Sequence, residues 1–190
     1  MSETVLPRDD RPRRSMLWRA VEAALWTGVL GLLVVRIAPQ LQAALGWRRA
    51  GVEAPAVTLE TLDGGVAALG QLKGRVVLVN FWATWCPPCR AEMPGLESVY
   101  EDRRAAGFTV LGISLDERAP AEVSAFLRDH AIRYPVAMAT PEAVAAFGGV
   151  STLPTSYLID RRGRVRYTVP GLFAGVALRA AVDRLLAEPR

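Results

Sequence analysis

The chain is poor in the side chains that build metal centres. Its 190 residues include two cysteines, Cys86 and Cys89, and one histidine, His130. A structural zinc ion needs four ligands, and the chain has no second cysteine pair, so we exclude a zinc site. We expect no bound metal and no cofactor. His130 is far in sequence from both cysteines, and we expect it to be structural or to lie on the surface.

Most of the chain also lacks an excess of either charge. Residues 51–190 contain fifteen Lys and Arg against fifteen Asp and Glu, so the formal net charge of +4 comes from residues 1–50. The C-terminal part shows no basic stripe interleaved with aromatic residues, which nucleic-acid-binding surfaces use. We therefore expect no nucleic-acid partner, despite a pI near 9.6.

The first fifty residues have the pattern of a membrane anchor. Several arginines precede an apolar run from Ala23 to Val35, and from Trp18 to Ile37 the segment reaches the roughly 20 residues that a bilayer core requires. The basic start predicts a cytoplasmic N-terminus and a translocated C-terminal domain. A cleaved signal peptide begins in the same way, but no convincing small-x-small cleavage site follows. An amphipathic surface helix or a core helix is a further alternative.

These features predict four segments in a single-pass protein of the bacterial inner membrane. Residues 1–17 are the basic cytoplasmic N-terminus, residues 18–45 the transmembrane anchor region and residues 46–53 a linker. Residues 54–190 are then the translocated domain, which faces the periplasm. Because that compartment is oxidising, two cysteines and no others indicate a pair that is cycled between dithiol and disulfide.

The cysteines form the motif Cys86-Pro87-Pro88-Cys89, between the apolar run 76–81 and a segment with helical periodicity. A helix N-terminus offers unpaired N–H groups and a partial positive charge, which favour a thiolate. Pro87 suits the first helical turn. Cys89 lies three positions on, on the same helix face, and can therefore close a disulfide with Cys86 or resolve a mixed one. We predict that Cys86 attacks and Cys89 resolves.

This cysteine pair has two alternative interpretations. A disulfide that closes so short a loop constrains the unfolded chain little, so a purely structural bridge is disfavoured. Cu(I) accepts two thiolate ligands, and a copper metallochaperone therefore remains an alternative.

Hydrophobic periodicity predicts an α/β domain. Strands are expected at 76–81 and 108–114 with a helix over 86–104 between them, which argues for parallel pairing through a helical crossover. Asp63-Gly64-Gly65, between 57–59 and 66–69, predicts an N-terminal hairpin. The remaining expected elements are helices at 119–130, 141–147 and 174–187 and strands at 155–160 and 165–169.

Two segments resemble the thioredoxin superfamily and, within it, the membrane-anchored TlpA/ResA-type thiol-disulfide oxidoreductases. The first runs from Val76 to Pro94 and contains both cysteines; the second runs from Gly149 to Asp160 and is similar to the stretch that carries a cis-proline in that family. The resemblance covers about residues 54–188. It implies a thioredoxin-like α/β fold with an N-terminal β-hairpin extension, and a redox-active disulfide between Cys86, the exposed nucleophile, and Cys89.

The resemblance also implies how a client protein is bound. Pro154 is expected to be cis and packed against the disulfide, and Leu153 to offer backbone hydrogen bonds to an extended client peptide. Trp85 and Pro87 flank Cys86 in sequence, so we place both in the substrate-binding surface.

Glu92 lies three residues after Cys89, and in ResA-like members a glutamate at this place modulates the cysteine pair. If it is buried, its pKa should rise, and it could exchange a proton with Cys89. A solvated surface glutamate is the alternative. Asn80 stands where classical thioredoxins have a buried aspartate, and Asn80 cannot titrate.

These observations predict a periplasmic protein-disulfide reductase. The resemblance suggests clients in cytochrome c or copper-site maturation and a membrane thiol donor of the DsbD/CcdA type. A disulfide oxidase or isomerase on the same fold is the alternative, because reduction potentials on this fold range from about −270 to −120 mV. Peroxidase activity is disfavoured, because the Pro-x-x-x-Thr/Ser-x-x-Cys arrangement of the related peroxiredoxins is missing before Cys86.

Overall fold

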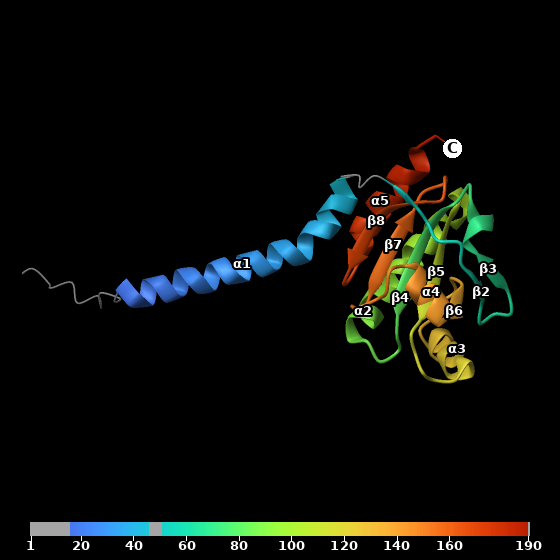
Figure 1. Cartoon of the computed structure of the whole chain (residues 1–190), viewed down its shortest axis with the longest axis horizontal. Helices are drawn as coiled ribbons and strands as arrows, with labels where there is room; N and C mark the ends of the chain where they lie inside the picture. The colour runs from blue at the N-terminus through green and yellow to red at the C-terminus, as the bar shows by residue number, and fades with distance from the viewer. Residues whose placement is uncertain (1–15, 46–50, 190) are drawn as a thin grey trace, which may run out of the picture. The chain divides into compact units, whose positions relative to one another are not determined.

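The computed structural model describes residues 16–45 and 51–189, which fall into two compact units divided after Arg36. The predicted basic N-terminus lies outside the described residues up to position 15, as does the predicted linker from 46 to 50. Figure 1 colours the chain from blue at the N-terminus to red at the C-terminus and labels most of the helices and strands.

The N-terminal helix α1 (Met16–Leu45) contains the segment predicted as the anchor. All of its side chains that the structure describes are exposed, including Trp18, Trp26 and Val35. Within the described residues, we find no helix whose length and apolar character suffice for a membrane crossing. The prediction that residues 18–45 are a membrane anchor stays a prediction.

The C-terminal unit is built on a six-stranded sheet in the order β1-β8-β7-β4-β5-β6. Strand β4 (Val76–Trp82) pairs in parallel with β5 (Phe108–Ser114), which pairs in parallel with β6 (Val136–Met138). On its other side β4 pairs antiparallel with β7 (Thr155–Ile159), followed by β8 (Arg164–Pro170) and β1 (Val52–Glu53). The parallel β4–β5 pair confirms the predicted crossover.

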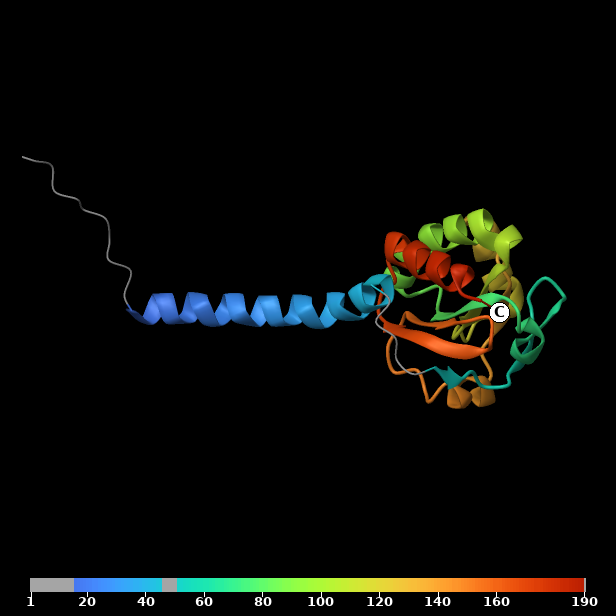
Figure 2. The same ribbon diagram turned by 90° about the horizontal axis from the view of Figure 1, so that it is seen from above.

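The two faces of the sheet have separate cores, and successive residues of β4 alternate between them. Val76, Leu78 and Trp82 pack on the face covered by α2 (Pro87–Arg103), α3 (Pro120–Asp129) and α5 (Gly175–Ala187). Val77, Val79 and Phe81 pack on the face covered by α4 (Pro141–Ala146). In Figure 2, α2 and α5 lie above the sheet and α4 lies below it. All seven residues of β4 are buried, as its continuous apolar run predicts.

The remaining elements largely match the expected ranges. Strands β2 (Thr58–Glu60) and β3 (Val66–Ala68) form the predicted hairpin as a separate two-stranded sheet, and short 3-10 helices follow at Leu69–Leu72 and Arg104–Ala106. Sequence patterns missed β6 and β1, because strands of three and two residues carry too little periodicity. Strand β1 falls within the predicted linker, so the folded domain begins before residue 54.

Candidate active site

Cys86 and Cys89 are joined by a disulfide at the N-terminus of α2. Cys86 is the N-cap residue, and its Sγ accepts a hydrogen bond from the backbone N–H of Cys89 at 3.3 Å. Pro87 occupies the first helical position, where its missing N–H costs no intrahelical bond. This placement puts the sulfur of Cys86 where the unpaired N–H groups of the helix stabilise a negative charge.

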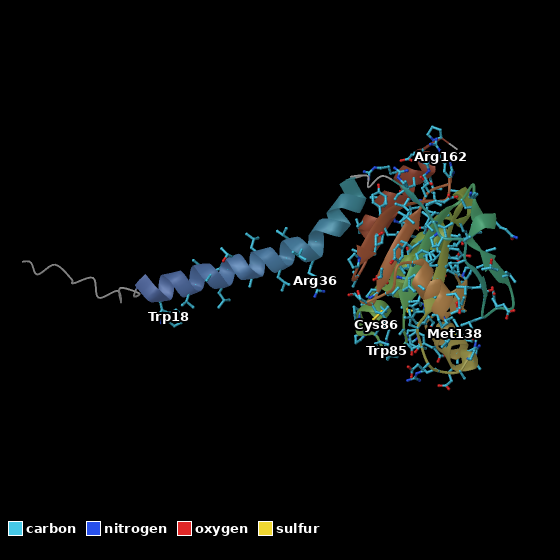
Figure 3. All side chains as sticks on the ribbon, in the orientation of Figure 1. Trp18, Arg36, Trp85, Cys86, Met138 and Arg162 are labelled. Carbon is cyan, nitrogen blue, oxygen red and sulfur yellow. A yellow bond between two sulfur atoms is a disulfide. The ribbon has the colours of Figure 1, made fainter. Side chains whose placement is uncertain are left out.

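The disulfide is less accessible than the resemblance implies. Cys86 is 3% exposed and Cys89 is fully buried, so the predicted exposed nucleophile is covered in this oxidised form. The order of accessibility is nevertheless the one expected, because only Cys86 reaches the surface at all. The exposed neighbour is Trp85, with 61% of its surface accessible; Figure 3 shows it beside Cys86 at one end of the domain.

Glu92 is buried beneath the surface of the domain, which excludes the solvated-glutamate alternative. Its Oε1 accepts a hydrogen bond from Nδ2 of Asn80, and its Oε2 accepts one from the backbone N–H of Phe173, both at 2.8 Å. Burial removes water from the carboxylate and raises the pKa of Glu92 to about 7, and the two hydrogen bonds offset only part of this effect. Glu92 can therefore gain or lose a proton near neutral pH.

Asn80 organises the polar groups around Glu92, a role that sequence reasoning did not assign to it. Its Nδ2 also donates to Oγ of Ser156 at 3.0 Å, while its Oδ1 has no hydrogen-bond partner among the described residues. The side chains of Asn80 and Ser156 come from directly paired positions of β4 and β7. The hydrogen bond to Ser156 on the neighbouring strand thus fixes the side-chain amide of Asn80, which in turn binds Glu92.

The Leu153–Pro154 peptide bond is cis, as the resemblance implies. Thr155, the next residue, pairs with Phe81 near the end of β4, so the proline lies at the same end of the sheet as the cysteines. The carbonyl oxygen of Pro154 accepts a hydrogen bond from the N–H of Gly171 at 2.7 Å. Leu153 is partly buried and packs against both cores.

The turn that carries Cys86 is held by a side chain that the sequence analysis missed. Oδ2 of Asp116 accepts a hydrogen bond from the backbone N–H of Thr84 at 2.9 Å, and Oδ1 accepts one from the Thr84 hydroxyl at 2.5 Å. The sequence does contain one indication of this contact. Asp116 is an acidic residue that follows closely after Ser114, the polar last residue of the buried strand β5. Trp85 lines a surface hollow nearby with Leu115, Glu117 and Arg118.

Side chains that could bind a metal ion are not clustered in the part of the chain that the structure describes. Within the described part of the chain, no cluster of three or more His, Cys, Asp or Glu side chains is placed to hold a metal ion. The ring of His130 stacks on Phe126, and its Nδ1 lies 2.8 Å from the carbonyl oxygen of the same residue. His130 lies exposed at the end of α3, in agreement with the prediction of a structural or surface residue.

Comparison with known proteins places these features in a family. Residues 50–168 match the AhpC/TSA family. The thiol-disulfide oxidoreductase ResA of Bacillus thuringiensis (strain Al Hakam) is 37% identical over 115 residues, which cover 60% of this chain and 66% of that protein. ResA of Bacillus subtilis (strain 168) is 35% identical over 121 residues, covering 64% and 67%. The first match therefore spans slightly less than two thirds of the relative.

A solved structure gives the same result. The thiol:disulfide interchange protein of the thioredoxin family from Chlorobium tepidum TLS superposes with a TM-score of 0.68 at 35% identity, covering 73% of this chain and 99% of that one. The thioredoxin-like fold is confirmed. The resemblance to ResA-type thiol-disulfide oxidoreductases is confirmed at the level of the family.

Proposed function

This chain belongs to the AhpC/TSA family, and on that premise we propose that it is a protein thiol-disulfide oxidoreductase that reduces disulfides in client proteins. The observation that carries the proposal is the Cys86–Cys89 disulfide at the N-terminus of α2, with the buried carboxyl group of Glu92 in the same helix.

The reaction is a two-step exchange that starts from the dithiol. The Cys86 thiolate attacks one sulfur of a client disulfide, which forms a Cys86–client bond and releases the other client sulfur as a thiolate that takes up a proton. Cys89 then loses its proton and attacks the sulfur of Cys86, and the second client sulfur leaves. Two electrons and two protons pass to the client, and the Cys86–Cys89 disulfide is formed.

We assign Glu92 the proton transfer of the second step. Cys89 and Glu92 are three residues apart in α2, which places their side chains on one face of the helix. A free cysteine has a pKa of about 8.5, so a buried carboxylate with a pKa of about 7 is well matched to accept the Cys89 proton.

The same carboxylate supports the reducing direction. When Glu92 is ionised, its negative charge disfavours a second negative charge on a neighbouring sulfur. A dithiol whose thiolate is poorly stabilised has a low reduction potential, and a strong oxidant requires the opposite. We therefore expect the pair to donate electrons, and we regard the oxidase or isomerase function as the alternative.

Equilibration of the full chain with glutathione buffers tests this direction. We expect a reduction potential below about −200 mV, in the range of the reducing members of this fold. A value above about −150 mV would reject the reductase function in favour of the oxidase or isomerase. The oxidised fraction can be measured by labelling free thiols with a maleimide and determining the mass of the chain by mass spectrometry.

Client proteins and an electron donor are the partners that this cycle needs. We propose disulfide-containing clients, such as proteins of cytochrome c or copper-site maturation, and a membrane thiol donor of the DsbD/CcdA type. The Cys89→Ala chain retains the attacking sulfur and lacks the resolving one, so it should accumulate a mixed disulfide through Cys86. Cys86→Ala is the matched control and should trap no client.

We also propose that the domain works in the periplasm and that α1 attaches it to the inner membrane. Membrane attachment is supported by the exposed apolar side chains on all sides of α1. A helix that is apolar on all sides is normally buried in protein or lipid. Fractionation of cells tests this: the full chain should sediment with membranes, and a chain lacking residues 1–45 should not. Recovery of both chains in the soluble fraction would contradict membrane attachment.

A further inference from the structure

Asp116 is a buried carboxylate that takes no part in the exchange proposed above. It follows β5 directly, and its side chain has 0% of its surface exposed. Besides its two hydrogen bonds from Thr84, it accepts one from the hydroxyl of Ser114 at 2.7 Å. The guanidinium of Arg118, 57% exposed, is 4.0 Å away, which makes it a weak outer partner.

Burying a carboxylate costs free energy unless hydrogen bonds replace the water that it loses. Here most of these hydrogen bonds come from residues 83–86, the turn between β4 and α2 that we call the redox turn. Two of the three donors belong to Thr84, two residues before Cys86. The backbone supports the same junction, since the N–H of Leu115 donates to the carbonyl oxygen of Trp82 at 2.8 Å. The residues that follow β5 are therefore hydrogen-bonded both to Trp82, the last residue of β4, and to Thr84 in the turn after it.

We propose that Asp116 is a positioning residue for the redox turn, which holds Cys86 at the N-terminus of α2 through its hydrogen bonds to Thr84. The inference rests on the proposed dithiol cycle. In the disulfide form the Cys86–Cys89 bond also restrains the turn. In the dithiol form that bond is absent, and the Asp116–Thr84 contact then restrains the turn together with the backbone hydrogen bonds of Cys86 to Ala83 and Arg90.

Reactivity of the reduced chain therefore tests the inference. The readout is the rate of iodoacetamide alkylation of Cys86 against pH, measured in a Cys89→Ala background so that a single thiol reacts. Asp116→Ala removes both hydrogen bonds that Thr84 donates to the Asp116 carboxylate. We expect its alkylation at pH 7 to slow by about fivefold to tenfold and the pH midpoint to rise, because a thiolate displaced from a helix N-terminus is less stabilised.

Asp116→Asn is the matched control, because an amide retains an oxygen for the Thr84 N–H and can donate to the Thr84 hydroxyl. If Asp116 acts by position, this variant should stay within about twofold of the parent chain. If it acts through its charge, Asn and Ala should shift the profile equally, and that result would overturn the inference. An unchanged profile in both variants would also overturn it.

A second pair of variants covers the case in which Asp116→Ala fails to fold. Thr84→Val removes one hydrogen bond to Asp116 and leaves the charge in place, whereas Thr84→Ser retains the hydroxyl. The inference requires slower alkylation for the valine variant and a near-parental profile for the serine variant; equal profiles would contradict it. A glutathione titration of the parent chain separates the two proposals, since an oxidising potential would reject the reductase function without affecting this comparison.

Discussion

Asn80 and Glu92 share a buried hydrogen bond in which Nδ2 of Asn80 donates to Oε1 of Glu92 at 2.8 Å. The other carboxylate oxygen is bound by a backbone N–H, that of Phe173. Both donors are uncharged, so they stabilise the ionised carboxylate less than a cation would. Glu92 is consequently held close to the balance between its neutral and ionised forms at neutral pH.

Glu92 should make the oxidised chain less stable as pH rises. Its folded pKa of about 7 lies above the ordinary value of 4.5, so its contribution is fully present below pH 4.5 and is lost as pH rises through about 7. The loss corresponds to about 3 kcal/mol. Glu92→Gln lacks this ionisation, so its stability relative to the parent chain should increase between pH 5 and pH 8 in urea unfolding. A difference that is independent of pH would show that Glu92 titrates normally.

Thiol reactivity should follow the same ionisation. In the reduced chain we expect the alkylation rate of the cysteines to show an inflection near pH 7 that is missing in Glu92→Gln, because the carboxylate exchanges a proton with the dithiol. Glu97→Gln, at a partly buried position further along α2, is the control and should keep the inflection. Identical profiles for the Glu92→Gln and parent chains would remove the proton role of Glu92.

Asn80→Ala should destabilise the chain more at pH 8 than at pH 5. The variant removes a hydrogen bond that lowers the pKa of Glu92, and the ionised carboxylate depends on that bond more than the neutral acid does. We expect an additional loss of about 1 to 2 kcal/mol at the higher pH. Ser156→Ala keeps the bond between Asn80 and Glu92, so its effect should be the same at both pH values.

Trp85→Ala should separate client binding from stability. The side chain is 61% exposed, so its removal should change the free energy of unfolding by no more than about 0.5 kcal/mol. Reduction of insulin should slow several-fold if Trp85 contacts the client. Val66→Ala, an exposed apolar residue on β3, controls for loss of apolar surface and should leave the rate unchanged. Equal rates for Trp85→Ala and the parent chain would exclude Trp85 from the binding surface.

Arg166→Met should destabilise the domain strongly. Arg166 is buried, and its Nη1 lies 3.1 Å from Oδ2 of Asp160 and 2.7 Å from Oε2 of Glu188. Removing the cation leaves acidic groups without compensation, which costs about 3 to 5 kcal/mol for a buried pair. Arg162→Met, at an exposed position of the same hairpin, is the control. Comparable denaturation midpoints for the two variants would show that the buried ion pairs contribute little.

Features encoded by neighbouring residues were predictable from the sequence. The Cys86–Cys89 spacing and Pro87 define a dithiol at a helix start, and the apolar run of β4 defines a buried central strand. The order of strands and helices and the N-terminal hairpin follow from periodicity and turn residues in the same way. The cis bond before Pro154 was implied by family resemblance rather than by any local pattern.

The environment of the site was decided by contacts between distant parts of the chain. Phe173 binds Glu92 across 81 positions, and Asp116 binds Thr84 across 32, so no local pattern reveals either bond. The pKa of Glu92 depends on how much water the surrounding helices and strands exclude, and this is a property of the packed domain. The sequence by itself therefore determined the spacing of the cysteine pair and its place at a helix start, because neighbouring residues encode both. The tertiary structure decided which distant groups surround the pair and its neighbour Glu92, because those contacts form only in the packed domain.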